Sequence, residues 1–303
     1  MNKRLSKSEF IFAYMIIITL ACFVGGFFFG AYYMKSKIEA QQAAVLEQQK
    51  LEAERERQLR EQKLYSEQDF IRFYYAVYAP VQELKRAHFE KMAAWPNLDK
   101  SAQKDALEQL VEAAKQTGKQ LDKEVPLPTS PLLVQAHSQF NTGVRAYLDG
   151  MKQLLSDQNS NALSPAAISS RLSLDGWFKG SEQFYHSLAV WESAYVTKQT
   201  LPKDVPANVS ADQWKQLPFH YKTYIAAHSI SAHKKWESYS PEDLTARLDL
   251  LFGSDDAKNL GIKDVDAAVR LLTATDAVHS GDFKEVQGKH YSSLKAPEIP
   301  LYR

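Results

Sequence analysis

An uncharged apolar segment at residues 10–34 constrains this chain more than any other feature of its sequence. The segment reads FIFAYMIIITLACFVGGFFFGAYYM. Because a helix rises about 1.5 Å per residue, about 25 residues reach about 37 Å, enough to cross a hydrocarbon core of about 30 Å. Tyr32 and Tyr33 lie where an interfacial aromatic belt is expected. The segment predicts a single-pass transmembrane helix.

Two other uses of an N-terminal apolar segment are less consistent with this sequence. The apolar region of a cleaved signal peptide is shorter, about 7–15 residues, and ends in a small-residue cleavage site. Residues 19–22, TLAC, loosely resemble the lipobox of a lipoprotein, but a leucine is missing from its usual place and the apolar run continues beyond Cys22. An uncleaved signal-anchor is therefore favoured.

The charges that flank the segment predict its orientation. Lys3, Arg4 and Lys7 precede it, whereas only Lys35 and Lys37 follow closely. Positive charge is enriched on the cytoplasmic side of membrane helices. We expect a short cytoplasmic N-terminus at residues 1–9, an anchor in the cell membrane, and the bulk of the chain outside the cytoplasm.

The anchor and the residues after it offer two routes to self-association. Gly26 and Gly30 form a G-x-x-x-G pair, which places small residues on one helix face and lets two helices approach closely. Residues 35–65 are rich in Gln, Glu, Lys, Arg and Ala, which predicts a polar helical stalk. Glu52 interrupts its seven-residue apolar repeat, so a single stalk or a weak coiled-coil dimer is favoured over a stable zipper.

From residue 66 onward, apolar residues recur at alternating steps of three and four, the period of amphipathic helices that pack on one another. The clearest stripe is Leu133, His137, Phe140, Val144, Tyr147, Met151 and Leu154; others begin at Phe70, at Trp177 and at Tyr221. No stretch of comparable length alternates with the period of two that half-buried strands show. The fold class predicted is all-α.

Prolines and glycines predict where these helices begin and break. Ser130-Pro131, Ser164-Pro165 and Ser240-Pro241 each place a capping hydroxyl before a proline suited to the first helical turn. Pro80 lies inside the first stripe and should kink or split it. Asp175-Gly176 and Gly180 leave the start of the third helix open.

The best candidate for a domain division is residues 201–210, which contain two prolines. Residues 66–200 then form an antiparallel helical bundle. Residues 211–303 form a smaller helical region with short helices and an extended C-terminal tail.

Composition and histidine spacing limit the chemistry. The net charge of +1 argues against nucleic-acid binding, which rests on neutralising phosphates. The only cysteine is Cys22, so the part after the anchor has no disulfide or Cys-based metal site. His220 and His228 share a helix face with Tyr224, but tyrosine is an unusual third ligand, and no metal or cofactor is predicted.

Residues 214–239 are the most aromatic part of the chain and contain Trp214, Tyr221, Tyr224 and Trp236. These side chains are candidates either for a recognition face or for the core. Trp236 ends a stripe that starts at Tyr221, so a helix over residues 218–239 would turn it toward its neighbours.

Three functions remain. The sequence favours a non-enzymatic, membrane-anchored helical interaction or scaffold protein with a protein partner. The second is a ligand-binding sensor subunit, in which a pocket between helices captures a small molecule. With nine residues before the anchor, that subunit would act with a membrane partner. The third, and least favoured, is a metal-assisted envelope enzyme that uses His220 and His228.

Overall fold

The computed structural model describes residues 14–27, 30, 33–35, 37–38, 41–42, 45–47, 50, 65–124, 126, 130–157, 163–199, 201–202 and 204–302. The chain divides into two units, Met1–Gln62 and Lys63–Arg303. Regular structure in the described ranges is helical, apart from one isolated antiparallel bridge between Ser210 and Asp264. The all-α prediction is confirmed.

In the first unit, residues 14–27 are helical, as are the shorter described stretches up to residue 50. Their large apolar side chains are exposed: Ile17 by 64%, Leu20 by 65% and Phe23 by 78%. Among the residues described, no helix combines the length and the hydropathy that crossing a membrane requires. The predicted anchor at 10–34 and the predicted stalk at 35–65 lie partly outside these residues.

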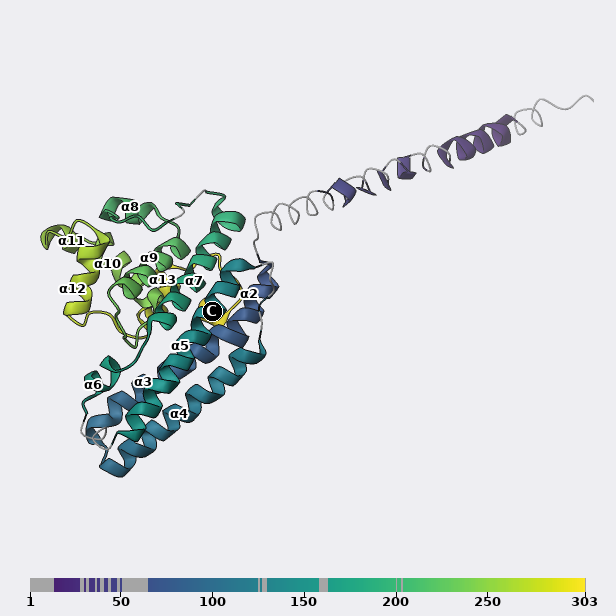
Figure 1. The fold of residues 1–303 in the computed structure, drawn as a ribbon. Helices are drawn as coiled ribbons and strands as arrows, with labels where there is room; N and C mark the ends of the chain where they lie inside the picture. Colours follow the sequence, from purple (N-terminus) through teal and green to yellow (C-terminus); the bar gives the residue numbers. More distant parts are fainter. Residues whose placement is uncertain are drawn as a thin grey trace, which may run out of the picture. The chain divides into compact units, whose positions relative to one another are not determined.

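Four long helical segments run side by side in the second unit (Figure 1). They are α2 (Glu67–Phe73) continuing through a π-helical turn η1 (Tyr74–Tyr78) into α3 (Ala79–Ala94), then α4 (Lys100–Lys123), α5 (Pro131–Ser156) and α7 (Asp175–Trp191). Short turns η2 (Trp95–Asn97), α6 (Pro165–Ser170) and η4 (Glu192–Thr197) connect or extend them.

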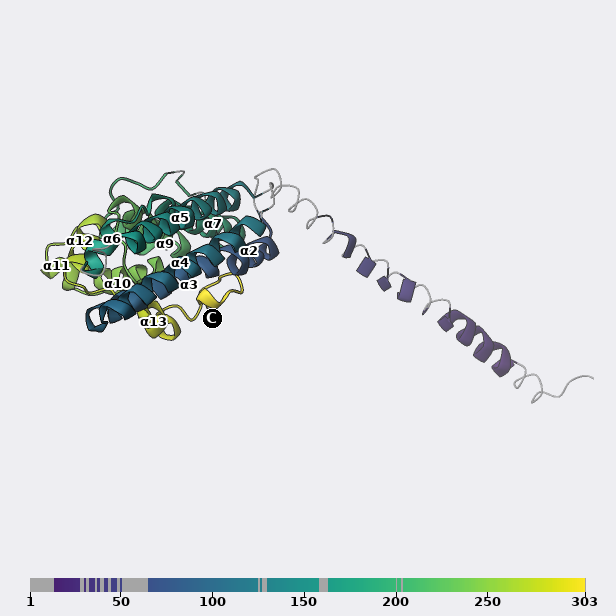
Figure 2. The ribbon, with the colours of Figure 1, turned by 60° about the horizontal axis from the view of Figure 1, so that its bottom comes forward.

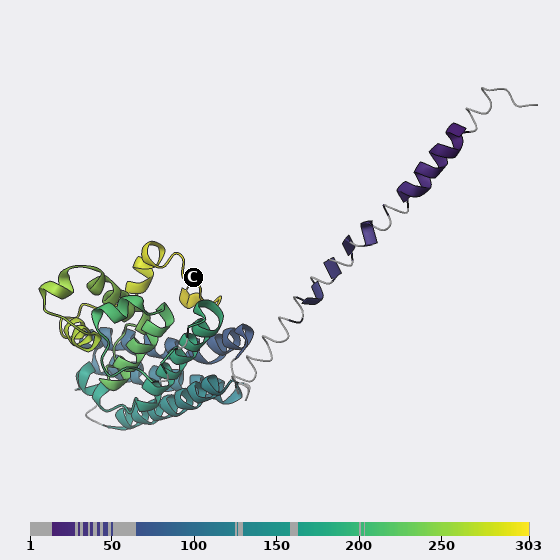
Figure 3. The ribbon, with the colours of Figure 1, turned by 90° about the horizontal axis from the view of Figure 1, so that it is seen from above.

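The later helices gather on one side of these four segments (Figure 3). They are α8 (Ala211–Gln216), α9 (Phe219–Ala232), α10 (Pro241–Gly253), α11 (Asp256–Asn259), α12 (Val265–Ala274), α13 (Asp282–His290) and the terminal turn η5 (Pro300–Tyr302). α9 packs on α7, and one continuous cluster of buried apolar residues extends from Tyr65 to Ile299.

Pro80 changes the hydrogen-bond pattern of the first helix but does not end it, and whether it kinks the helix remains a prediction. A proline cannot donate to the carbonyl four residues earlier and its ring crowds that carbonyl. The chain widens into the π-helical turn η1 just before Pro80, which lies in the first turn of α3. The carbonyl of Ala76, which loses its helical donor, accepts a 3.3 Å hydrogen bond from the side chain of Gln120 in α4.

Two glycines bring α5 and α7 into backbone contact. A Cβ at Gly143 would lie 2.5 Å from the backbone nitrogen of Trp177, and one at Gly176 would lie 2.6 Å from the nitrogen of Gly143. The start of α7, which the sequence left open, is Asp175, so Gly176 and Gly180 lie within the helix. Their lack of a side chain permits the closest packing in the bundle instead of breaking it.

The expected capping hydroxyls are present at two of the three Ser-Pro sites. Ser164 accepts from the backbone nitrogen of Ala167, and Ser240 forms a reciprocal capping box with Asp243. The prediction for Ser130 is wrong: its backbone is not extended (ψ 73°), and its buried hydroxyl makes no side-chain cap.

The prediction that one helix continues to Tyr239 is also wrong, because α9 ends at Ala232. Lys234 adopts a left-handed conformation (φ 49°), and the backbone nitrogen of Lys235 bonds back to the carbonyl of Ile230. This is the hydrogen-bond pattern of a Schellman C-terminus. Trp236 therefore lies in the loop after the helix.

Candidate functional site

A cleft of about 650 Å³ opens between one face of η1 and α3 and the N-terminal ends of α10 and α13. Figure 2 shows α13 and the C-terminal turn beside α3. Tyr74, Tyr78, Gln82, Lys85 and Phe89 follow one another at steps of three and four, so one face of η1 and α3 forms a wall. The opposite wall contains Ser240, Glu242, Asp243, Gly281, Phe283, Lys284 and Leu301.

Lys85 carries its charge into this cleft. Its ammonium donates a 2.9 Å hydrogen bond to the carbonyl of Tyr239 and lies 6.0 Å and 5.6 Å from the ring centroids of Phe89 and Trp236. Burial lowers the pKa of Lys85 to about 8, although nearby carboxylates, chiefly Asp243, act in the opposite direction. Within the described part of the chain, no carboxylate lies within 4 Å of this ammonium.

Glu242, in the first turn of α10, is only 1% exposed. The hydroxyl of Tyr185 donates to its Oε2 at 2.7 Å and that of Tyr302 to its Oε1 at 3.1 Å. The hydroxyls of Tyr185 and Tyr78 lie 2.6 Å apart, so a chain of phenols leads from the wall of the cleft to the carboxyl group. Burial raises the pKa of Glu242 to about 7.

Asp243 shapes the far wall of the cleft. Its Oδ2 accepts from the backbone nitrogen and the hydroxyl of Ser240, which caps α10. Its Oδ1 accepts from the backbone nitrogens of Gly281 and Phe283. Gly281 has a positive φ of 98°, which suits glycine. One buried carboxylate thus receives four hydrogen bonds and holds the turn at residues 280–283 against α10.

A further buried carboxylate, Glu192, lies at the start of η4, directly after α7. Glu192 accepts a 2.9 Å hydrogen bond from the backbone nitrogen of His220, in the first turn of α9. α9 has no side-chain cap at Pro218, so Glu192 satisfies a free N–H group at its N-terminus. Burial raises the pKa of Glu192 to about 7, and hydrogen bonds from this helix end oppose that shift.

The aromatic candidates from the sequence separate in space. Trp214 is fully buried, and its indole donates to Asp249 at 2.7 Å. Tyr221 and Tyr224 are buried on α9, where Tyr224 stacks on His186 with ring centroids 4.6 Å apart. Of the four, only Trp236 lies next to the cleft, through its contact with Lys85.

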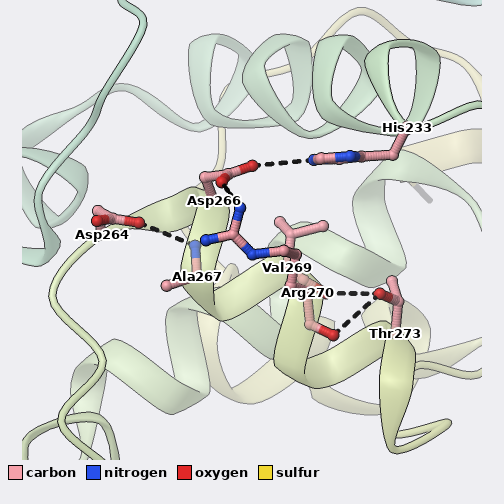
Figure 4. Close-up of polar contacts among 7 residues, drawn as sticks. All are labelled: His233, Asp264, Asp266, Ala267, Val269, Arg270 and Thr273. Carbon is pink, nitrogen blue, oxygen red and sulfur yellow. Dashed lines mark hydrogen bonds and ion pairs between the residues drawn. The ribbon is translucent and has the colours of Figure 1, made fainter.

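The histidines noted in the sequence do not converge. His220 is buried beside Trp191, whereas the ring of His228 lies 2.7 Å from Glu182 at the surface. His233 lies 2.9 Å from Asp266, which also pairs with Arg270 (Figure 4). In the described ranges, no three His, Cys, Asp or Glu side chains are grouped as metal ligands. Here His233 joins the end of α9 to α12.

Gly26 and Gly30 lie in helical positions of the first unit, and a Cβ at either would meet no atom within 4 Å. Their predicted role in helix association remains a prediction.

Lys85 was not predicted to be a site residue, although it lies next to Leu84 in the helix whose stripe begins at Phe70. A lysine at the edge of an apolar helix stripe was the available signal. Glu242 was not predicted either, although it directly follows the Ser240-Pro241 helix start. Comparison with protein-family models, curated proteins and solved structures finds no match to the chain.

Proposed function

We propose that this protein is a non-enzymatic, membrane-anchored binding protein whose helical body captures a small-molecule ligand in the cleft between α3 and α10. The observation that carries this proposal is the cleft itself. Its volume of about 650 Å³ falls within the range of about 300–1,000 Å³ that is typical of small-molecule sites. The cleft favours the ligand-binding function over a plain scaffold.

The hydrogen bonds accepted by the buried acids of the cleft support ligand binding over catalysis. Asp243 receives four hydrogen bonds and Glu242 receives two from tyrosines. A general base needs a free lone pair within hydrogen-bond reach of the proton it removes. All four acceptor positions of Asp243 are filled, and each oxygen of Glu242 is bound by a tyrosine, which suits a site that binds without reacting.

The membrane anchor is a proposal that rests on residues 10–34. Its described helical part, residues 14–27, carries no charged residue and exposes Ile17, Leu20 and Phe23. The hydroxyl of Thr19 is satisfied within the helix by the carbonyl of Met15 at 2.8 Å. An uncharged helix that exposes large apolar side chains suits a lipid environment. The helical body would then lie outside the cytoplasm.

A ligand-binding subunit of this kind acts together with a partner in the membrane. That partner is either a second copy of this chain or another protein. Gly26 and Gly30 offer the helix face for that contact.

The expected consequence of the membrane anchor is that the full-length protein stays with membranes in high salt and needs detergent for release. Recovery of full-length protein in the salt-soluble fraction would contradict the anchor.

Site-specific photocrosslinking in the native membrane tests the occupant of the cleft. Ala93, an exposed residue of its lining, is replaced by a photoreactive phenylalanine. Leu260, which is 59% exposed and does not line the cleft, carries the same group as a control. We expect a small-molecule adduct at Ala93 only, visible in the intact mass. A polypeptide adduct at Ala93 would restore the scaffold function, and no adduct would contradict both.

A further inference from the structure

We infer that the cleft selects a small amphiphilic carboxylate, with the carboxylate on the ammonium of Lys85 and the apolar part against the aromatic wall of η1 and α3. This inference rests on the proposed ligand-binding function and names its ligand class.

The first step is the incomplete coordination of Lys85. An ammonium group has three donors, and one of them meets the carbonyl of Tyr239 at 2.9 Å. The two aromatic rings beside it, Phe89 and Trp236, attract the charge but accept no conventional hydrogen bond. Charged groups withdrawn from water are normally paired. Among the described residues, Lys85 thus has no carboxylate within 4 Å, although Asp243, Glu237 and Glu242 act on it at longer range.

The second step is that the acids around Lys85 are occupied. Asp243 is surrounded by four donors from Ser240, Gly281 and Phe283. Glu242 is held by Tyr185 and Tyr302. Burial raises the pKa of Glu237, and Glu237 forms no ion pair with Lys85 within 4 Å. An anion from solution is the missing partner.

The third step is the chemistry of the remaining surface. Tyr74, Tyr78, Phe89, Phe283 and Leu301 give the cleft apolar walls. At its rim, Arg86 pairs with Glu83 and Glu90, so this arginine is committed to its own helix. Lys284, in the opposite wall, is exposed to solvent and donates to the carbonyl of Pro300 at 3.5 Å. Lys85 is therefore the more withdrawn of the two lysines in the lining, and a buried cation beside aromatic walls fits a carboxylate with an aryl or alkyl group.

The test measures binding of three related probes to the full-length protein in lipid nanodiscs by calorimetry. The probes are 3-phenylpropionate, 3-phenylpropanamide and 3-phenylpropylamine, which share the ring and chain and differ in charge. We expect 3-phenylpropionate to bind at least about tenfold more tightly than the amide, because a charge-assisted contact is worth about 1.4 kcal/mol or more.

Lys85→Met is the informative variant, and Lys179→Met, on the exposed face of α7, is its matched control. Lys85→Met removes a buried charge and keeps the aliphatic volume, so the variant should fold with an unchanged or higher melting temperature. It should lose about tenfold or more in affinity for 3-phenylpropionate and keep its affinity for the amide. Lys179→Met should change neither affinity.

The other outcomes separate this inference from the proposed function. Equal binding of carboxylate and amide, insensitive to Lys85→Met, would overturn the carboxylate assignment and leave a ligand-binding cleft. Tightest binding of the amine would overturn it in favour of a cation site. Failure of all three probes would overturn the inference, and the Ala93 crosslink would then decide the proposed function independently.

Discussion

The phenol of Tyr185 donates a 2.7 Å hydrogen bond to the carboxyl group of Glu242, and this contact joins α7 to the first turn of α10. Tyr302, in the C-terminal turn, donates to the other carboxyl oxygen. Segments from before and after residues 201–210 thus meet at one buried acid. The protonation state of Glu242 should therefore affect the stability of the whole helical body.

Replacing Glu242 with Gln should change how stability depends on pH. Burial raises the pKa of Glu242 from 4.5 to about 7, so the folded state binds more protons than the unfolded state between these values. The contribution of Glu242 to stability is therefore present at about pH 4.5 and is lost as pH rises to about 7. The Gln variant should gain up to about 3 kcal/mol relative to wild type across this window.

Urea unfolding followed by circular dichroism at pH 4.5 and pH 8 measures that gain. Glu108→Gln is the control, because it makes the same change on the exposed face of α4. Its difference from wild type should be nearly the same at both pH values. A Glu242→Gln difference that does not depend on pH would contradict the buried, shifted acid.

The helical fold was predictable because the apolar residues that pack in the core recur at a regular spacing along the sequence. The apolar residues of the stripe from Leu133 to Leu154 are buried along α5, as the three-and-four spacing requires, and only His137 is half-buried. The end of α9 was not predictable in the same way. A Schellman C-terminus usually contains glycine, but here Lys234 takes the left-handed position, so the sequence carries no stop signal. The apolar stripe therefore continues in the sequence to Trp236, beyond the true end of the helix at Ala232.

The candidate site was less predictable than the fold, because tertiary contacts define it. Lys85 and Glu242 belong to different helices, and only their burial distinguishes them from ordinary surface charges. Glycine posed a similar problem. Gly176 was considered as a helix breaker, but its role depends on the partner glycine Gly143, which no local pattern connects to it.

Gly143→Ala should destabilise the protein, because the new Cβ would lie 2.5 Å from the backbone of Trp177 and would push α5 away from α7. Overpacking of this kind typically costs about 1–3 kcal/mol. Gly118→Ala in α4 is the matched control: the nearest atom to its Cβ is 3.9 Å away, and it should stabilise the helix by about 0.5–1 kcal/mol. Thermal unfolding should show melting temperatures that move in opposite directions. Two shifts of the same sign would contradict the close contact.

The two serines that precede prolines should respond differently to alanine. Ser240→Ala removes the hydroxyl that accepts from the backbone nitrogen of Asp243, and the loss of such a cap costs about 1 kcal/mol. Ser130→Ala removes a buried hydroxyl that has no hydrogen-bond partner, so stability should be unchanged or slightly higher. Chemical denaturation of both variants checks the contrast. Equal losses would show that Ser130 does cap α5.

Trp236→Ala tests whether this loop residue belongs to the core. The indole lies with ring centroids 4.9 Å from Trp177 and 5.5 Å from Phe89, so it closes an aromatic cluster beneath the cleft. Truncation of a packed Trp typically costs about 3–5 kcal/mol; because Trp236 is only partly buried, we expect about 3 kcal/mol. Tyr75→Ala, at a tyrosine that is 53% exposed, is the control and should cost less than about 0.5 kcal/mol. A Trp236 variant that melts within a degree or two of wild type would place this side chain on the recognition surface.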